Sequence, residues 1–199
     1  MLKRNLIANY LGQGWKALMS LAFIPLYIKY LGIESYGLIG IFALLQSWLG
    51  LLDMGMKPTL SREMARATGG AHSAQSIRNI LRSIEIITVA MASVISIGIM
   101  AVSVWLASDW LRTEKLPVAT AAQAFTIMGI VTALSFIEGI YSSSLVGLQR
   151  QVLLNALSSA TATLRGFGAV GVLIWISPTL EAFFIWQGSV SILSIIILK

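Results

Sequence analysis

The sequence of 199 residues contains no cysteine, which excludes disulfides, thiolate catalysis and cysteine metal sites. It contains a single histidine, His72, in the polar segment 68–73, where we expect a solvated side chain. A Walker-A loop, a His-Glu-x-x-His motif, a Gly-x-Ser-x-Gly motif and paired catalytic carboxylates at helical spacing are also missing. We therefore expect no metal, no cofactor, no ATP hydrolysis in this chain and no enzymatic activity.

Charge is scarce as well. Charged residues make up 11% of the chain and hydrophobic residues 57%, with a mean hydropathy of +0.83, which exceeds what one soluble core needs. The alternating polarity of a β-barrel is not seen. Apolar runs of about 20 residues, enough for a helix to cross roughly 30 Å of hydrocarbon, recur along the chain. The sequence predicts an all-α integral membrane protein with six spans near 5–29, 37–56, 83–107, 120–145, 153–176 and 182–198.

The basic residues are unevenly distributed. The net charge is +6 with a pI of about 9.9, but the placement of the charges argues against nucleic acid as a partner. Alternate connections hold most of the cations, and the opposite ones hold only Lys29, Arg112 and Lys115. By the positive-inside rule, both ends of the chain are cytoplasmic. The connections assigned to the cytoplasm contain Lys3, Arg4, Lys57, Arg62, Arg66, Arg78, Arg82, Arg150 and Lys199.

The amino-terminal segment is predicted to be a retained first helix. Its opening Met-Leu-Lys-Arg resembles the start of a signal peptide. The apolar stretch that follows is too long for one, contains Lys16 and lacks a cleavage site with small residues. Pro25 lies inside this span, where its ring removes a backbone hydrogen bond and bends the helix. Either a moving hinge or a static kink at Pro25 fits this pattern.

The first and fifth spans each carry a polar stripe with a cation. In the first, Asn9, Gln13, Lys16 and Ser20 fall on one helical face. A lone lysine in mid-membrane costs about 2.5–3.5 kcal/mol on insertion scales, so this face should meet protein or a water-filled cavity.

The stripe in the fifth span contains Ser158, Thr161 and Arg165, whose guanidinium is harder to neutralise than an ammonium. Gly166, Gly168 and Gly171 in the same span predict close approach of another helix.

The fourth span supplies the opposite charge. Thr132, Ser135, Glu138 and Ser142 share one face, with Tyr141 beside it. Glu138 either pairs with Arg165 or Lys16 in a register-fixing ion pair, or it titrates and couples transport to an ion. Desolvation favours its protonated form, and a nearby cation favours the charged one.

The stretch LLDMGMKPTLSREMAR, residues 51–66, places a carboxylate at the end of an apolar span. Gln46, Gly50, Asp53 and Lys57 share one stripe. A carboxylate at a helix carboxyl end is disfavoured by the macrodipole and needs cations close by. Lys57, Arg62 and Arg66 are the candidates, and together with Asp53 they predict a charge cluster at a cytoplasmic corner. We expect Asp53 to organise the turn, with a direct role in substrate binding as the alternative.

The longest predicted connection, 57–82, contains two helical stretches separated by the polar segment 68–73. Arg78 and Arg82 lie one turn apart in the second stretch. Anionic lipid headgroups suit such a pair, at about 1 kcal/mol per basic side chain. The alternative is that these charges only set topology.

The segments YLGIESYGLIGIFALLQ (30–46) and LLDMGMKPTLSREMAR (51–66) resemble the start of Wzx-type polysaccharide (O-antigen) flippases. These belong to the superfamily that also holds multidrug and toxin extrusion antiporters and lipid II flippases. The resemblance covers the first two spans and the following loop. It implies a V-shaped, MATE-like transporter of two six-helix lobes in the bacterial inner membrane, of which residues 1–199 form the amino-terminal lobe, with the second lobe absent from this chain.

The resemblance further implies a substrate and a mechanism. The substrate is an oligosaccharide linked to undecaprenyl pyrophosphate, received in a cationic cavity and moved by alternating access between the lobes. Lys16, Arg165, Gln13 and Asn9 are the expected cavity residues, and Glu138 is the candidate for H⁺ or Na⁺ coupling. Membrane lipids and polysaccharide assembly proteins are the other expected partners.

Two other functions remain open at the level of sequence. A drug or cation antiporter of the same superfamily would usually have an acidic cavity, whereas Lys16 and Arg165 against Glu138 leave a net charge of +1. A membrane-embedded acyl or glycosyl transferase would need an acid or base near the membrane surface, and Asp53 with its following arginines comes closest.

Overall fold

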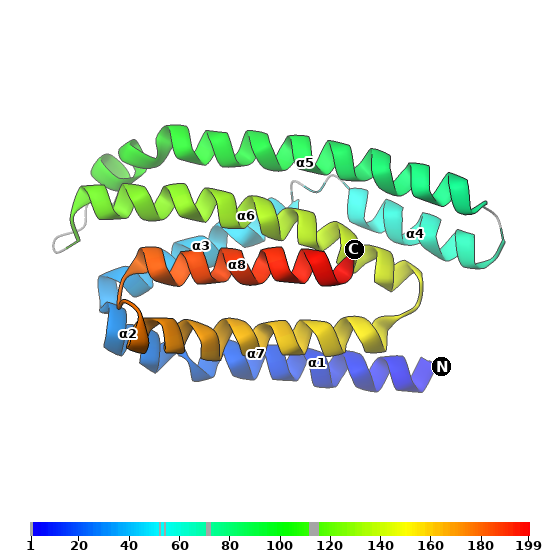
Figure 1. Ribbon diagram of the computed structural model, residues 1–199, viewed down its shortest axis with the longest axis horizontal. Helices are drawn as coiled ribbons and strands as arrows, with labels where there is room; N and C mark the ends of the chain where they lie inside the picture. The colour runs from blue at the N-terminus through cyan, green and yellow to red at the C-terminus, as the bar shows by residue number, and fades with distance from the viewer. Residues whose placement is uncertain (1, 52, 54, 71–72, 112–115) are drawn as a thin grey trace.

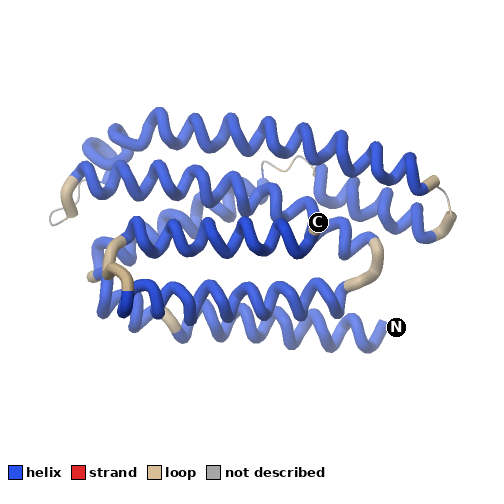
Figure 2. Tube along the Cα trace, in the orientation of Figure 1, coloured by secondary structure: helices blue, strands red, loops and turns tan. Residues whose placement is uncertain are grey.

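The computed structural model describes all residues except 1, 52, 54, 71–72 and 112–115 (Figures 1 and 2). His72, Arg112 and Lys115 lie outside the described residues, as do the side chains of Lys3 and Arg4. The described part of the chain is helical and contains no strand, which confirms the all-α prediction there. The elements are α1 (Leu2–Ala22), α2 (Ile24–Leu31), α3 (Ile33–Leu51), α4 (Met56–Thr68), α5 (Ala74–Trp105), the π-helical segment η1 (Leu106–Leu111), α6 (Val118–Gly147), α7 (Gln151–Trp175) and α8 (Leu180–Leu198).

The long helices lie lengthwise in one bundle and alternate in direction along the chain (Figure 1). The amino terminus, α4, the start of α5 and the turn between α6 and α7 lie at one end of the bundle. The junction of α2 with α3, the start of α6 and the turn between α7 and α8 lie at the other end. The segments with the greater share of basic residues therefore meet at one end.

Four helical segments among the described residues are long and apolar enough to cross a membrane: Gln75–Leu111, Val118–Gly147, Gln151–Trp175 and Leu180–Leu198. They correspond to the last four predicted spans, and large apolar side chains such as Val94, Ile97 and Phe167 are exposed on them. These features fit a membrane protein. The first two predicted spans are helical but are not among the four: α1 is interrupted by polar residues, and α3 has Glu34 in its first turn.

The first predicted span is broken near Pro25. Helix α1 ends at Ala22, and α2 begins at Ile24 with the proline in its first turn. Proline has no N–H, so its position near a helix start leaves no donor unsatisfied. The predicted bend is therefore confirmed as a helix break. Movement about this break stays a prediction.

The predicted helical stretch before residue 68 is α4, and its apolar face packs on α6. Leu60 and Met64 of α4 are buried with Ile140 of α6. Gly147 of α6 makes this approach possible, because a Cβ there would collide with the Ser61 carbonyl oxygen. Helix α4 is thus part of the bundle as well as the carrier of three basic residues.

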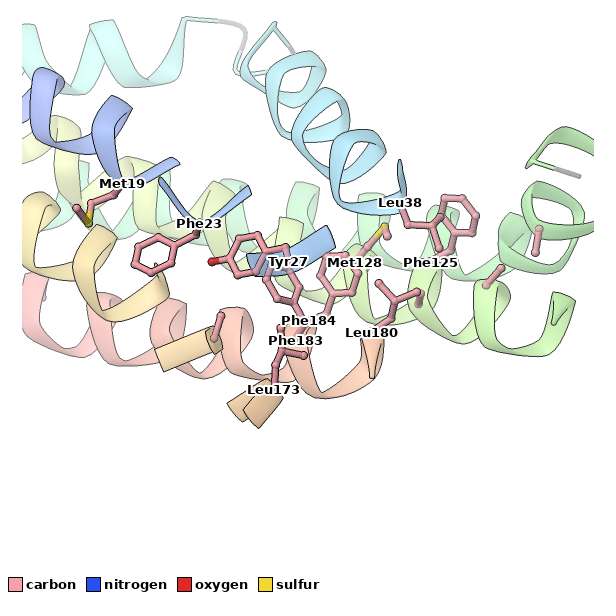
Figure 3. Packing of buried hydrophobic residues seen from close by; sticks show 14 residues of the cluster. Met19, Phe23, Tyr27, Leu38, Phe125, Met128, Leu173, Leu180, Phe183 and Phe184 are labelled. Carbon is pink, nitrogen blue, oxygen red and sulfur yellow. The ribbon is translucent and has the colours of Figure 1, made fainter. Parts of the chain in front are cut away.

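The main core joins α1, α2, α3, α6, α7 and α8 (Figure 3). Its aromatic rings meet edge to face: Tyr27 and Phe183 have centroids 5.1 Å apart, and Phe42 and Phe184 have centroids 5.2 Å apart. Such pairs add about 0.5–1.5 kcal/mol each beyond area burial. The polar groups described below lie beside this core.

The predicted close approach at the glycines of α7 is confirmed for two of the three. A Cβ at Gly166 would collide with the Phe23 ring, and one at Gly168 would collide with the Trp186 ring. At Gly171 a Cβ would meet Trp175 at an ordinary distance of 3.4 Å. Gly166 follows Arg165 directly, so the packing against Phe23 also fixes where the arginine leaves the helix.

Candidate functional site

A cavity of about 650 Å³ opens between the helices beside the aromatic core. Its walls come from six helices, and its polar lining contains the stripes predicted from separate spans. Ser20 comes from α1, Gln46 from α3, Ser135 and Glu138 from α6, and Arg165 from α7. The sequence thus predicted residues that the fold brings to one place, although they are up to 145 positions apart.

The centre of this polar lining is an ion pair. Arg165 Nη2 donates to Glu138 Oε2 at 2.9 Å, and the two side chains are 25% and 19% exposed. Each partner is also held by α8: Arg165 Nη2 donates to Ser191 Oγ at 2.8 Å, and Ser194 Oγ donates to Glu138 Oε1 at 2.7 Å. A charge removed from water needs such additional hydrogen bonds as well as its opposite charge. The four groups therefore form one network across α6, α7 and α8.

A second polar contact lies on the same cavity. Gln46 Nε2 of α3 donates to Ser135 Oγ of α6 at 3.0 Å. Ser135 precedes Glu138 by three residues and so lies on the same face of α6. Gln187 of α8, which is buried, adds an amide to the lining. Neutral donors and acceptors thus flank the ion pair.

The rest of the cavity wall is apolar or aromatic. Tyr27, Tyr36, Phe42 and Phe183 all line it. Pockets with mostly apolar walls and a few convergent polar groups are typical of sites for organic ligands. Chemically, the arrangement offers one cation and one carboxylate, each of which would be released for a ligand if the other were neutralised or displaced.

The remaining predicted cavity residues of α1 lie elsewhere. Lys16 is half-buried and Gln13 is exposed, and neither is among the residues that line this cavity. Asn9 forms an amide cluster with α7: its Nδ2 donates to Gln151 Oε1 at 2.8 Å, and Asn155 donates to Asn9 Oδ1. Asn9 thus joins α1 to α7 near the end of the bundle that holds the amino terminus (Figure 1).

The predicted corner at Asp53 has a defined geometry. The Lys57 backbone N–H donates to Asp53 Oδ2 at 3.1 Å, and Lys57 Nζ lies 3.8 Å from Asp53 Oδ1. Asp53 is buried, and its Oδ1 has no hydrogen-bond partner in the described structure. The carboxylate therefore precedes α4 and caps its first turn, where the macrodipole favours a negative charge. The expected role in organising the turn is explained by this bond.

Lys57 ties the corner to α6. Its Nζ lies 5.2 Å from the centroid of the Phe136 ring, and its carbonyl oxygen accepts a hydrogen bond from Ser143 Oγ at 2.9 Å. The other two predicted members of the cluster point elsewhere. Arg66 pairs with Glu63 at 3.2 Å, and exposed Arg62 lines a separate groove with Asn9 and Gln149. Of the three cations expected near Asp53, the described ion pair involves Lys57.

Sequence reasoning did not single out the contribution of α8. Gln187, Ser191 and Ser194 are all buried and follow an i, i+4, i+7 spacing that places them on one face. The same test that identified the stripes of the other spans would have found this one. The amides of Gln151 and Asn155 at the start of α7 were also not predicted from the sequence.

Comparisons with protein-family models, with curated proteins and with solved structures gave no match. The described residues contain no group of three histidine, aspartate or glutamate side chains that could hold a metal ion.

Proposed function

We propose that this chain belongs to a transporter that moves an oligosaccharide linked to undecaprenyl pyrophosphate across the bacterial inner membrane. The observation that supports this proposal is the half-buried Arg165 on the wall of a polar and aromatic cavity between helices that can cross a membrane. A pyrophosphate needs compensating positive charge in a layer of low dielectric constant, and arginine binds phosphate oxygens through two parallel hydrogen bonds. The lipid tail stays in the bilayer while the head group crosses.

In this proposal Glu138 holds Arg165 until substrate arrives. The incoming pyrophosphate displaces the carboxylate and takes over the guanidinium. Glu138, now without its cation, is the candidate group for coupling transport to H⁺ or Na⁺. Ser191 and Ser194 position the two groups for this exchange.

The finer architecture is also a proposal. All six predicted spans cross the membrane in a MATE-like lobe, α1 with α2 forming the first span and α3 the second. Both ends are cytoplasmic in this proposal, because the segments that contain Arg78 and Arg150 share one end of the bundle with the amino terminus, and α8 runs toward that end (Figure 1). Alternating access then exposes the cavity to either side in turn.

Lys16 is assigned a place on the substrate path next to the cavity. It precedes Ser20, a lining residue, by one helical turn on the same face of α1. A cation there would attract the pyrophosphate toward Arg165. Gln13 and Asn9 continue this face toward the amino terminus and offer amides to sugar hydroxyls.

A drug or cation antiporter is the second candidate function. The ion pair favours it, because Arg165 is already neutralised by Glu138 in this structure. Tyr27, Tyr36 and Phe42 could stack on an organic cation, which aromatic faces attract. In that case Glu138 would be the ligand for the substrate and Arg165 its resting counter-ion.

The test is rescue of surface polysaccharide in a flippase-deficient bacterium, normalised to the amount of protein in the membrane. Arg165→Gln should lower export at least about tenfold, which corresponds to about 1.4 kcal/mol of lost interaction. Lys16→Gln should lower it less, because Lys16 is not on the cavity wall. Arg66→Gln, which removes an exposed cation of α4 outside the groove of Asn9, is the matched control and should export normally. Normal export by the Arg165 variant would reject the mechanism.

A further inference from the structure

A second cavity, of about 790 Å³, lies where the start of α5 meets α6 and the end of α8. Three cations reach it: Arg78 and Arg82 from α5, and Lys199 from the residue after α8. Glu85 is the one acidic side chain in its lining, so its side chains carry a net charge of +2. It shares no residue with the cavity that contains Arg165.

This second cavity, called the groove below, contains a network of polar contacts. Lys199 Nζ donates to Glu85 Oε1 at 3.0 Å, and the buried Tyr141 of α6 donates its hydroxyl hydrogen to the same oxygen. The hydrogen bond to Glu85 raises the pKa of Lys199, which keeps the ammonium charged. Glu85 thus accepts hydrogen bonds from Tyr141 of α6 and from Lys199, and the two exposed arginines of α5 line the same groove.

The wall of the groove changes character along α5. Arg78, Arg82, Glu85 and Val89 succeed one another at spacings of three or four residues and so share one face. Beyond Glu85 the lining is apolar, with Ile86 63% and Val89 43% exposed. Arg82 and Val89 are separated by seven residues, or about 10 Å along the helix. The groove therefore has a cationic mouth at the start of a membrane-crossing helix and a lipophilic wall deeper along it.

We propose that this groove binds the headgroup phosphate of an anionic phospholipid, with one acyl chain along Ile86 and Val89. Arg78 and Arg82 lie one turn apart and can hold a phosphate between two guanidinium groups. The apolar wall distinguishes a lipid from a free phosphate, which has no tail to place there. A zwitterionic lipid carries its own cation and has less to gain from a groove of net charge +2.

The test is ligand-dependent thermal unfolding of the purified chain in detergent micelles. The probes are phosphatidylglycerol, phosphatidylcholine and sn-glycerol 3-phosphate. Phosphatidylglycerol should raise the midpoint in a saturable manner, because a ligand that binds only the folded state stabilises it. The double variant Arg78→Gln/Arg82→Gln should bind it about 30-fold more weakly, from the loss of two basic contacts.

The matched control is Arg62→Gln/Arg66→Gln, which removes two exposed arginines four residues apart from the same end of the bundle. It should change the affinity less than about threefold. Arg78→Lys/Arg82→Lys keeps both charges, and most of the affinity should return. This variant separates loss of binding from failure to fold.

Three results would overturn the proposal. Equal loss of affinity in both double glutamine variants would show a general effect of charge. Phosphatidylcholine binding as tightly as phosphatidylglycerol would show an apolar groove without headgroup selection. sn-Glycerol 3-phosphate stabilising the chain as well as phosphatidylglycerol would identify a site for free phosphate esters.

Discussion

Two pairs of opposite charges occupy different places in this molecule and are built differently. Glu138 and Arg165 come from separate helices, lie 2.9 Å apart and are each held by a serine of α8. Asp53 and Lys57 are four residues apart in sequence, and their charged atoms are separated by 3.8 Å. The first pair joins three helices around a cavity. The second supports the start of one helix.

The difference lies in where the stabilisation comes from. At the cavity, both carboxylate oxygens of Glu138 and Nη2 of Arg165 have hydrogen-bond partners, so removal of one member leaves the other partly desolvated without its opposite charge. At the corner, Asp53 Oδ1 has no hydrogen-bond partner among the described residues, while Oδ2 accepts a hydrogen bond from the Lys57 backbone N–H. We conclude that charge matters at the cavity and that a hydrogen-bond acceptor matters at the corner.

The largest loss of stability is expected when one member of the Arg165–Glu138 pair is replaced by an apolar residue. Arg165→Met should lower the free energy of unfolding by about 2–3 kcal/mol, below the value for fully buried pairs because both side chains keep some exposure. Chemical denaturation in micelles measures this loss. The double variant Arg165→Met/Glu138→Met should recover at least half of it, because no unpaired charge remains. An equal or larger loss in the double variant would contradict the account of the network.

The second-largest loss of stability is expected from disrupting the packing of α4 against α6. Gly147→Ala places a Cβ against the Ser61 backbone and should cost about 2 kcal/mol, since backbone atoms cannot move aside cheaply. Gly98→Ala is the control, because nothing lies within 4 Å of a Cβ at that position. It should be neutral or slightly stabilising. Equal thermal midpoints for the two variants would show that α4 is not held by this contact.

The smallest loss of stability is expected at Asp53, where two substitutions distinguish its role as a hydrogen-bond acceptor from the role of its negative charge. Asp53→Ala should cost about 1 kcal/mol through loss of the cap on α4. Asp53→Asn keeps an acceptor, removes the buried charge, and should change the unfolding free energy by less than about 0.5 kcal/mol. Denaturant midpoints of the two variants measure the difference. If asparagine destabilised the protein as much as alanine, the charge of Asp53 would be the important property.

Much of the fold follows from residues that act locally. The helices of the last three spans were predicted within about two residues, whereas the helical segment of the third span, Gln75–Leu111, extends beyond the predicted 83–107 at both ends. The apolar runs are long and are separated by segments that contain Ser73, Pro117 and Thr179, which lie at helix starts. The first two predicted spans are helical, but the break at Phe23 could be placed only near Pro25. The packing of α4 on α6 depends on Gly147, 86 residues after Ser61, and no local pattern contains it.

The site was predictable to the extent that polar stripes mark helix faces. Helical spacing selected Glu138 and Arg165 and left two partners open for Glu138, because it does not say which faces meet. The fold resolves this choice in favour of Arg165. Lys16 was selected by the same rule but lies outside the cavity lining, since the rule fixes a face and not a depth along the helix. Ser191 and Ser194 were not predicted because the charged residue of α8, Glu181, lies in its first turn and is not part of their stripe.

The central claim is that Arg165 receives the pyrophosphate and that Glu138 competes for it. The most direct measurement is the affinity of the purified chain for undecaprenyl pyrophosphate, compared between the wild type and Glu138→Gln. Neutralising the competitor should tighten binding by about tenfold, with Arg165→Gln changing it in the opposite direction. Weaker binding of the lipid pyrophosphate to Glu138→Gln, together with loss of organic-cation binding, would contradict the account and favour the cation antiporter.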